Sequence, residues 1–318
     1  MQYQNFFIIY IYNIMIKNII ICLLIILIVI GICCIINKCL YGLNKVENFS
    51  ETLFKNDKPI IWTYWETKPG KTKPEYLDLC LDTLFKYCND DFNIIRLNEK
   101  NIYDYLPNLR KDMDQLLIAQ KTDYIRVALL YKYGGIWIDA DTIVMRKLND
   151  IISKLNEGYD YIGFGCSEPI CFNGYPKPSN GVMASKKSSV LMEAVLKDLD
   201  NMLDSKKQNY DYFDLGKVVL WRNIDELLKE GNFMYYQYPS AFDGSRDKDG
   251  VWVNVDNHIS KDKTELIDKE KLFFVFLENN KFMGNDDKYN WFSKLTKNEV
   301  LNGDYWISQL FRDSLNQS

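Results

Sequence analysis

The sequence predicts an α/β fold that is built around a parallel sheet and preceded by one membrane-spanning helix. From residue 58 onward, short apolar stretches alternate with segments of helical periodicity, which is typical of a parallel sheet. The chain has 318 residues, 47% of them hydrophobic and 14% aromatic, so it can bury one substantial core. Residues 19–36 carry no charged side chain, and at 1.5 Å per residue they reach about 27 Å, enough to cross a thin bilayer.

The N-terminal segments differ in composition from the rest of the chain. A cleaved signal peptide is the competing account of the apolar run, but the run is too long for such a peptide and no clean small-residue cleavage site follows it. Lys17 on one side nearly balances Lys38 and Lys45 on the other, which leaves the orientation open. We expect four regions: an interfacial segment (1–18), a transmembrane anchor (19–37), a stem (38–57) and a folded domain (58–318).

Within the folded domain, hydrophobic periodicity predicts the order of the elements. Short apolar or alternating runs predict strands at 60–65, 92–97, 136–138, 159–164, 182–185, 234–238, 251–255 and 272–277. Helical periodicity predicts helices at 77–88, 113–133, 188–203, 212–228 and 298–311, the third capped by Ser188. A loop rich in Pro and Gly, residues 166–181, is either a lid beside the site or a surface insertion.

Two aspartates follow the short strand at 136–138. In extended backbone, residues two apart project to the same side, so Asp139 and Asp141 can direct both carboxylates at one point. Their repulsion favours a compensating divalent cation, magnesium or manganese, which keeps open positions for phosphate oxygens. A turn with two solvated acids is the competing reading. The preceding Gly134 and Gly135 end a helix, so the acids emerge at the carboxyl end of a core strand, where α/β sheets bind ligands.

Each of the other candidate site residues could have either a functional or a purely structural role. Asp123 and Arg126 are three apart on one helical face, either as a simple ion pair or as two groups that reach into the same crevice. Trp62 and Tyr64 either stack on a nucleotide base or pack in the core. Asp211, with Asp214, is a candidate for sugar or acceptor contacts or for helix capping.

A family resemblance rests on the block KTDYIRVALLYKYGGIWIDADT at residues 121–142. This block resembles the corresponding block of glycosyltransferase family 32 and of the related capsular polysaccharide synthesis proteins. Shorter pieces agree with the capsular branch, namely IWTYW at 61–65, CL at 80–81, NGVMASK at 180–186, DYF at 211–213 and KLT at 294–296. The pieces together span roughly residues 58 to 300.

The resemblance implies a GT-A type, Rossmann-like nucleotide-sugar-binding domain. Such a domain would move a sugar from a UDP- or GDP-sugar to a glycan, polysaccharide or lipid-linked acceptor. The transfer would retain the anomeric configuration of the sugar. It implies Mn²⁺ or Mg²⁺ as cofactor and a single-pass membrane location. The implied catalytic and metal-binding residues are Asp139 and Asp141. His258 is either a third metal ligand, as the late histidine of family 32 members suggests, or a loop histidine without a role in the site. The implied donor-binding residues are Trp62, Tyr64, Asp123, Arg126 and Gly135, and the implied acceptor or sugar contacts are Asn180 and Asp211.

Composition excludes some classes of protein. The net charge of −4 gives no electrostatic support for nucleic-acid binding. One histidine and the cysteine spacing exclude a zinc enzyme, and Cys166 with Cys171 form either a disulfide or two free thiols. Two alternatives remain open. One is a phosphatase of the DxDx[TV] type, in which the first aspartate is the nucleophile, and the other is a membrane-anchored binding protein without catalytic activity.

Overall fold

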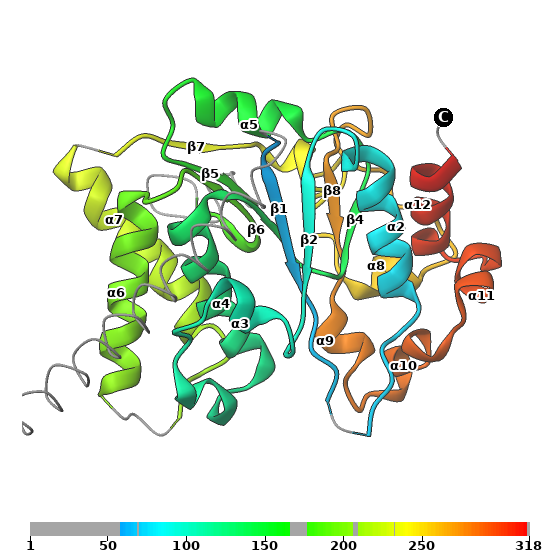
Figure 1. Cartoon of the computed structure of the whole chain (residues 1–318). Coiled ribbons are helices and arrows are strands. Elements are labelled where there is room, and N and C mark those ends of the chain that lie inside the picture. The colour runs from blue at the N-terminus through cyan, green and yellow to red at the C-terminus, as the bar shows by residue number, and fades with distance from the viewer. Residues whose placement is uncertain (1–57, 69, 166–176, 206–208, 232, 317–318) are drawn as a thin grey trace, which may run out of the picture. The chain divides into compact units, whose positions relative to one another are not determined.

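A six-stranded mixed sheet in the order β2-β1-β3-β6-β5-β7 runs through the computed structural model (Figure 1). The structure describes residues 58–68, 70–165, 177–205, 209–231 and 233–316. The strands are β1 (Ile60–Tyr64), β2 (Asn93–Leu97), β3 (Gly135–Ile138), β5 (Tyr161–Phe164), β6 (Ser179–Ser185) and β7 (Tyr235–Gln237). The predicted α/β class is confirmed.

The direction of one strand differs from the prediction. β1 pairs in parallel with β2 and β3, as expected, and β7 pairs in parallel with β5. β6, however, lies between β3 and β5 and is antiparallel to both. β6 follows β5 directly in the chain, whereas parallel neighbours need a crossover connection, commonly a helix. The prediction of a wholly parallel sheet was therefore wrong.

Helices cover both faces of the sheet. On one face lie α4 (Ile118–Tyr133), α6 (Val190–Asp204) and α7 (Val219–Glu230), and on the other lie α2 (Tyr76–Cys88) and α5 (Asn149–Asn156) (Figure 1). β1 shows why both faces are apolar, since Trp62 packs into the core under α4 and α6 while Ile61 packs into the core under α2. Alternate side chains of a strand point to opposite faces, so a strand covered on both sides is apolar throughout.

A second, two-stranded sheet continues the chain after β3. β4 (Thr142–Val144) pairs in antiparallel fashion with β8 (Phe274–Phe276). β4 is fixed to α2 and to α12 (Trp306–Asn316), because Val144 N–H donates to Thr83 Oγ1 at 3.0 Å and Ser314 Oγ donates to Val144 O at 2.6 Å. The remaining helices are α3 (Ile102–Tyr105), α8 (Val255–Ile259), α9 (Asn279–Phe282), α10 (Asp287–Asn290) and α11 (Lys297–Asn302), and the short helical turns are η1 (Lys111–Gln115), η3 (Asp214–Val218), η4 (Ser240–Phe242) and η5 (Phe292–Lys294).

Several predicted helices are interrupted. The predicted helix 113–133 is divided into η1 and α4, because Leu117 is extended and caps α4 with its N–H bonded to Gln120 Oε1 at 3.2 Å. The predicted helix 212–228 begins as the π-helical turn η3, which is kinked at Gly216, and continues as α7. The predicted helix 298–311 is α11 followed by α12.

Two smaller local predictions were also wrong. The predicted strand 251–255 does not form as an element, because Asn254 accepts a hydrogen bond from Asp256 N–H and starts α8 at Val255. The predicted cap Ser188 has a φ of 56°, and the residue at the N-cap position of α6 is Ser189.

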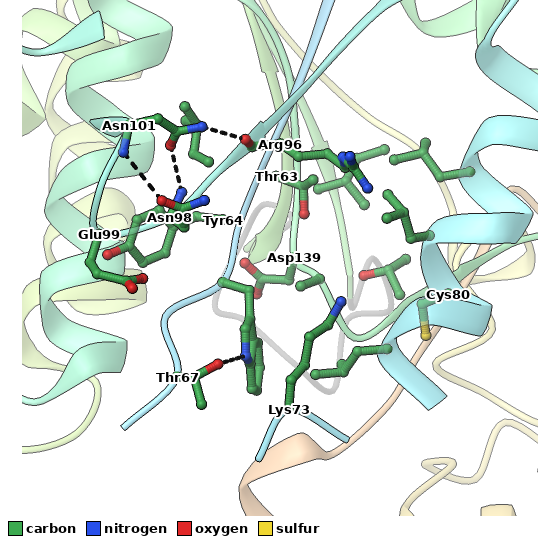
Figure 2. Close-up of a pocket in the computed structure, with 18 of the residues that line it drawn as sticks. Thr63, Tyr64, Thr67, Lys73, Cys80, Arg96, Asn98, Glu99, Asn101 and Asp139 are labelled. Atoms are coloured by element: carbon green, nitrogen blue, oxygen red, sulfur yellow. Dashed lines mark hydrogen bonds between the residues drawn. The ribbon is translucent and has the colours of Figure 1, made fainter. Parts of the chain in front are cut away.

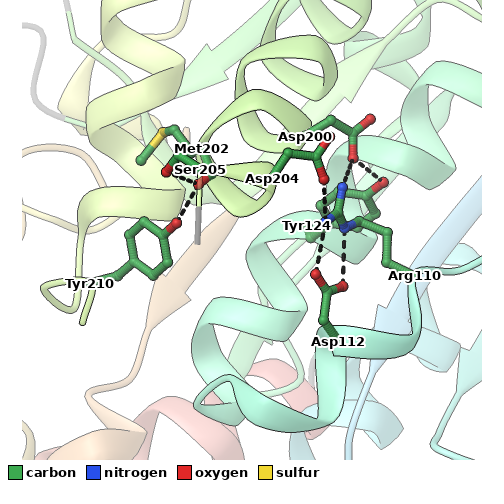
Figure 3. Close-up of polar contacts among 8 residues, drawn as sticks. All are labelled: Arg110, Asp112, Tyr124, Asp200, Met202, Asp204, Ser205 and Tyr210. Carbon is green, nitrogen blue, oxygen red and sulfur yellow. Dashed lines mark hydrogen bonds and ion pairs between the residues drawn. The ribbon is translucent and has the colours of Figure 1, made fainter. Parts of the chain in front are cut away.

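An arginine connects the chain before α4 to α6. Arg110 donates to Asp112 and Asp204 at 2.7 Å and to Asp200 at 3.1 Å (Figure 3). Tyr124 of α4 also donates to Asp200, at 2.9 Å. This cluster joins η1, α4 and α6 on the face of the sheet that carries the site described below.

None of the helices in the part of the chain that the structure describes is long and apolar enough to span a bilayer. The predicted interfacial segment (1–18), anchor (19–37) and stem (38–57) lie outside the described residues.

Candidate active site

A pocket of about 460 Å³ opens at the carboxyl ends of β1, β2 and β3 (Figure 2). Parallel strands that end at one edge of a sheet leave a crevice there, which is where α/β folds bind ligands. α2 contributes one wall of the pocket. The charged and amide side chains that line it are Lys73, Arg96, Asn98, Glu99, Lys100, Asn101 and Asp139.

The turn after β2 is held by its own asparagines. Asn98 Oδ1 accepts from Lys100 N–H at 2.8 Å. Asn101 Nδ2 donates to Arg96 O at 2.9 Å (Figure 2). These bonds fix the backbone that presents Arg96 and Lys100 to the pocket. We did not predict this basic wall, although the position of Asn98 directly after a predicted strand was a usable signal.

Asp139 is the aspartate that reaches the pocket. Its backbone N–H donates to Gly181 O at 2.8 Å, and its Oδ1 accepts from Trp137 Nε1 at 2.8 Å. The side chain keeps 29% exposure. Burial raises the pKa of Asp139 above its ordinary value, although the positive charge of Arg126 opposes the shift.

Asp139 and Asp141 belong to a turn. Thr142 N–H donates to Asp139 O at 3.2 Å and closes it, so the predicted extended geometry was wrong. The Asp141 side chain is held by α9, because its Oδ2 accepts from Asn279 N–H at 3.2 Å. Burial, and then the charge of Asp139, raise the pKa of Asp141 to about 7. The negative charge of Asp139 thus disfavours ionisation of Asp141.

Behind Asp139, a buried cluster joins α4 to β6. Arg126 Nη2 lies 3.2 Å from an Asp139 oxygen and 3.4 Å from Asp123 Oδ1, and its Nη1 donates to the carbonyl of Asn180. Asn180 Nδ2 in turn donates to Asp123 Oδ1 at 2.7 Å. Arg126 also lies 5.2 Å from the centre of the Trp137 ring.

Burial dominates the electrostatics of this cluster. Asp123 is 6% and Arg126 is 5% exposed, and neither lines the pocket. Burial raises the pKa of Asp123 to about 7 against the lowering effect of Arg126. The predicted residues Asp123, Arg126 and Asn180 are therefore brought together with Asp139, one layer behind the pocket wall.

The charges of the site fit a divalent cation. With all three carboxylates ionised, Arg126 leaves two negative charges uncompensated. Carboxylate oxygens are the ligands that Mg²⁺ and Mn²⁺ prefer, and these ions keep positions for water or phosphate. Among the described residues, no three His, Cys, Asp or Glu side chains gather as a metal-binding group. Asp139 and Asp141 would thus supply only part of a coordination sphere.

Three predicted residues lie away from this cluster. Trp62 is fully buried, donates from Nε1 to Gly134 O at 2.9 Å and packs on Tyr133, so it is a core residue and lines no part of the pocket. Gly135 begins β3, whereas Asp139 follows its other end. A Cβ at Gly135 would lie 2.4 Å from Ile60 O, which gives this glycine a steric role. Tyr64 does line the pocket, as predicted, and donates to Glu66 at 2.6 Å.

His258 is buried in another part of the protein. It is 1% exposed, stacks on Trp306 with ring centres 5.5 Å apart, and has no hydrogen-bond partner at either nitrogen. Burial lowers its pKa to about 4. The structure does not bring it into a metal-binding group with Asp139 and Asp141, so the predicted third ligand is not found there.

The segment before η3 is close to the cluster. Asp211 is exposed, and its N–H donates to Asp214 Oδ2 at 3.0 Å. The N-cap of η3 is Phe213, so neither aspartate is the N-cap of that helix. The two aromatic residues that follow, Tyr212 and Phe213, belong to the piece DYF at 211–213 and had no predicted role; both are about half exposed. Cys166 and Cys171 lie outside the described residues.

Comparison with known proteins gives a family and several distant relatives. The sequence pattern of the capsular polysaccharide synthesis protein family matches residues 33–219. The uncharacterized glycosyltransferase L373 of Acanthamoeba polyphaga mimivirus is 24% identical over 141 residues, which are 44% of this chain and 53% of that protein. The chain thus spans about half the length of the curated relative that it matches.

Three solved structures are similar at low identity. A glycosyltransferase involved in glycosylation of the major capsid of PBCV-1 is 14% identical, with a TM-score of 0.41 over 74% of this chain and 100% of that one. The PaToxG glycosyltransferase is 15% identical, with a TM-score of 0.40 over 62% and 82%. The galactosyltransferase LgtC is 10% identical, with a TM-score of 0.39 over 76% and 98%.

Proposed function

The chain belongs to the capsular polysaccharide synthesis protein family, and we propose that it is a glycosyltransferase of the GT-A type that moves a sugar from a nucleotide diphosphate sugar to an acceptor hydroxyl with retention of configuration. One observation carries the proposal. Asp139 lines a 460 Å³ pocket at the carboxyl ends of three strands, and Asp141 follows it in a tight turn. A nucleotide diphosphate and a divalent cation complement such a site in charge and in position.

The pocket is suited to the nucleotide end of the donor. Lys73, Arg96 and Lys100 place positive charge on its walls, and Tyr64 lies at the end of β1. Arg and Lys side chains bind phosphate oxygens through charge-assisted hydrogen bonds. With the diphosphate directed toward Asp139, the UDP or GDP portion occupies the pocket and the sugar lies beside the buried cluster.

The chemistry expected at the aspartate pair is electrostatic. Bound Mn²⁺ or Mg²⁺ supplies a Lewis acid that stabilises charge on a departing diphosphate. In the transfer, the bond from the anomeric carbon to the diphosphate oxygen breaks with its electrons on oxygen, a bond to the acceptor oxygen forms, and the acceptor proton is released. Arg126 holds Asp139 in place, and Asp123 pairs with Arg126 from behind the pocket wall.

We also propose a membrane location. The uncharged run at 19–36 is long enough for a single N-terminal anchor, with the stem at 38–57 and the transferase domain at 58–318 beyond it. An anchored transferase is suited to glycan or lipid-linked acceptors.

The proposal is tested by thermal unfolding of the full chain in detergent. UDP, GDP and their sugar conjugates are added with and without Mn²⁺. One nucleotide should stabilise the protein only with Mn²⁺, by about 2.7 kcal/mol at a hundred times its dissociation constant. Asp141→Ala should lose this effect, and Asp249→Asn, at an exposed site, should keep it. Retention of the Mn²⁺-dependent effect in Asp141→Ala would refute the assigned role.

Two activity assays separate the alternatives. Release of nucleoside diphosphate from the donor in the presence of Mn²⁺ would exclude a protein that only binds. Release of phosphate from sugar phosphates without any acceptor would favour the phosphatase instead. Asp139 is poorly placed as a nucleophile, because Trp137 and Arg126 already engage its carboxylate.

A further inference from the structure

Two adjacent aromatic side chains are exposed beside the buried cluster. Tyr212 is 47% and Phe213 is 49% exposed, and their rings meet edge to face with centres 5.0 Å apart. Exposed aromatic pairs are uncommon because their burial is favourable. Neither residue lines the donor pocket. The turn η3 that follows them packs against Asn180 and Asp123 of the buried cluster.

The backbone that carries the two rings is fixed. Gln120 Nε2 of α4 donates to the carbonyls of Tyr210 and Asp211 at 3.0 and 3.4 Å. Tyr210 itself donates to Met202 O in α6, at 2.5 Å (Figure 3). The exposure of Tyr212 and Phe213 therefore belongs to an anchored segment.

The same segment touches the cluster directly. A Cβ built on Gly216 would lie 2.6 Å from both Asn180 Nδ2 and Asp123 Oδ2, so the backbone of η3 packs against these side chains. The pKa of Tyr212 is raised by burial and then by the charges of Asp123, Asp139 and Asp141, which agrees with this proximity.

We propose that Tyr212 and Phe213 form a platform that binds a sugar ring of the acceptor. The inference rests on the proposed transferase function and names the acceptor class as a saccharide. The C–H face of a pyranose is apolar and packs on aromatic rings, while its hydroxyls need polar partners at the edge. Asp211 is exposed beside the rings and supplies such a polar partner. Lys217 Nζ lies over one face of the Phe213 ring, 3.6 Å from its centre, so a sugar would pack on the opposite face.

The arrangement also explains how the acceptor meets the donor. η3 packs against Asp123, Asp123 and Asp139 both pair with Arg126, and Asp139 lines the donor pocket, so the platform and the pocket border the same charged cluster. We therefore expect an acceptor hydroxyl to lie near the sugar end of the donor.

Binding of methyl α- and β-glycosides of common hexoses to the full chain tests the platform by saturation-transfer NMR. Wild type should bind at least one glycoside, through the C–H protons of one face. A double variant, Tyr212→Ala with Phe213→Ala, should bind it at least about fourfold more weakly, since each aromatic contact contributes roughly a factor of two to ten. Tyr212→Phe should retain binding, and Trp252→Ala, at another exposed aromatic residue, should not change it.

Thermal unfolding with nucleotide and Mn²⁺ is measured on the same variants. If nucleotide with Mn²⁺ stabilises the double variant against thermal unfolding as much as it stabilises wild type, the fold and the donor site are intact. Equal glycoside binding by wild type and the double variant, or no binding by wild type, would overturn the platform. A nucleotide effect that is absent from wild type while glycosides still bind at Tyr212 and Phe213 would refute the transferase proposal alone.

Discussion

Replacing Asp141 by asparagine should stabilise the metal-free protein above pH 7 while removing its response to metal and nucleotide. The native protein holds a proton on Asp141 at pH values where the unfolded chain has lost it, because burial and Asp139 raise the pKa from 3.8 to about 7. The stability of wild type therefore falls as pH rises from about 4 to 7. Asparagine has the same shape without the charge, so it avoids this loss.

The magnitude follows from the shift in pKa. Each pH unit corresponds to about 1.4 kcal/mol, so the rise from 3.8 to about 7 sets an upper limit of about 4 kcal/mol. Solvent reaches part of the Asp141 side chain, and its hydrogen bond from Asn279 survives in the variant, so we expect about 2 kcal/mol. For a chain of this size that is roughly 5 °C in the unfolding midpoint.

The assay is thermal unfolding of wild type and Asp141→Asn between pH 4 and 9 in the presence of a chelator. The difference should be small near pH 4 and largest above pH 7. With Mn²⁺ and nucleotide the order should reverse, because wild type alone gains binding energy. An Asp141→Asn variant that unfolds at or below the wild-type temperature at pH 8 without metal would show that the two carboxylates do not repel each other.

Three further predictions concern neighbouring features. Arg126→Ala leaves a buried carboxylate without its partner, so the free energy of unfolding measured in urea should fall by about 3 kcal/mol. The variant should also lose discrimination between donor sugars more than affinity for the nucleotide. An equal loss of both would count against the placement of Arg126. Gly135→Ala should destabilise the protein by about 3 kcal/mol, because the new Cβ would lie 2.4 Å from a carbonyl oxygen at a φ of 96°, and unchanged unfolding would contradict that contact. Burial lowers the pKa of His258 to about 4, so the unfolded chain alone takes up its proton below about pH 6.5 and stability falls as pH drops toward 4. His258→Phe should remove this loss of stability at low pH, which is about 2 kcal/mol. Equal unfolding of wild type and the variant at pH 5 would disprove the lowered pKa of His258.

The parts of the fold that local signals determine were predicted well. β1 and β2 lie within one residue of the predicted strands. The glycine pair and the strand before Asp139 form as expected, and α4 forms the later part of the predicted helix 113–133. These features depend on hydrophobic periodicity and on the freedom of glycine at positive φ, which neighbouring residues reveal. The direction of β6 could not be predicted in this way, because a buried strand has the same apolar pattern in parallel and antiparallel neighbours.

Side-chain roles were predictable only where position along a strand was known. Trp62 and Tyr64 point to the same face of β1, yet Tyr64 reaches the pocket because it lies at the carboxyl end, whereas Trp62 lies two residues deeper in the core. His258 was chosen for its chemistry, and its burial against Trp306 depends on the packing of α8 on α12, which no short motif encodes. The cations of the pocket come from common surface residue types, so composition gave no reason to select them.

The turn that carries the two acids also links separate sheets. Asp139 is bonded through its backbone to β6 of the large sheet, whereas the backbone oxygen of Asp141 accepts from Leu277, just beyond β8 of the small one. Only Ala140 separates them. A sliding motion of one sheet past the other would thus change the distance between the two carboxylates. An ion bound by both carboxylates would restrain that motion. Occupancy of the site would then be mechanically coupled to the C-terminal third of the chain, beyond the part that matches the family.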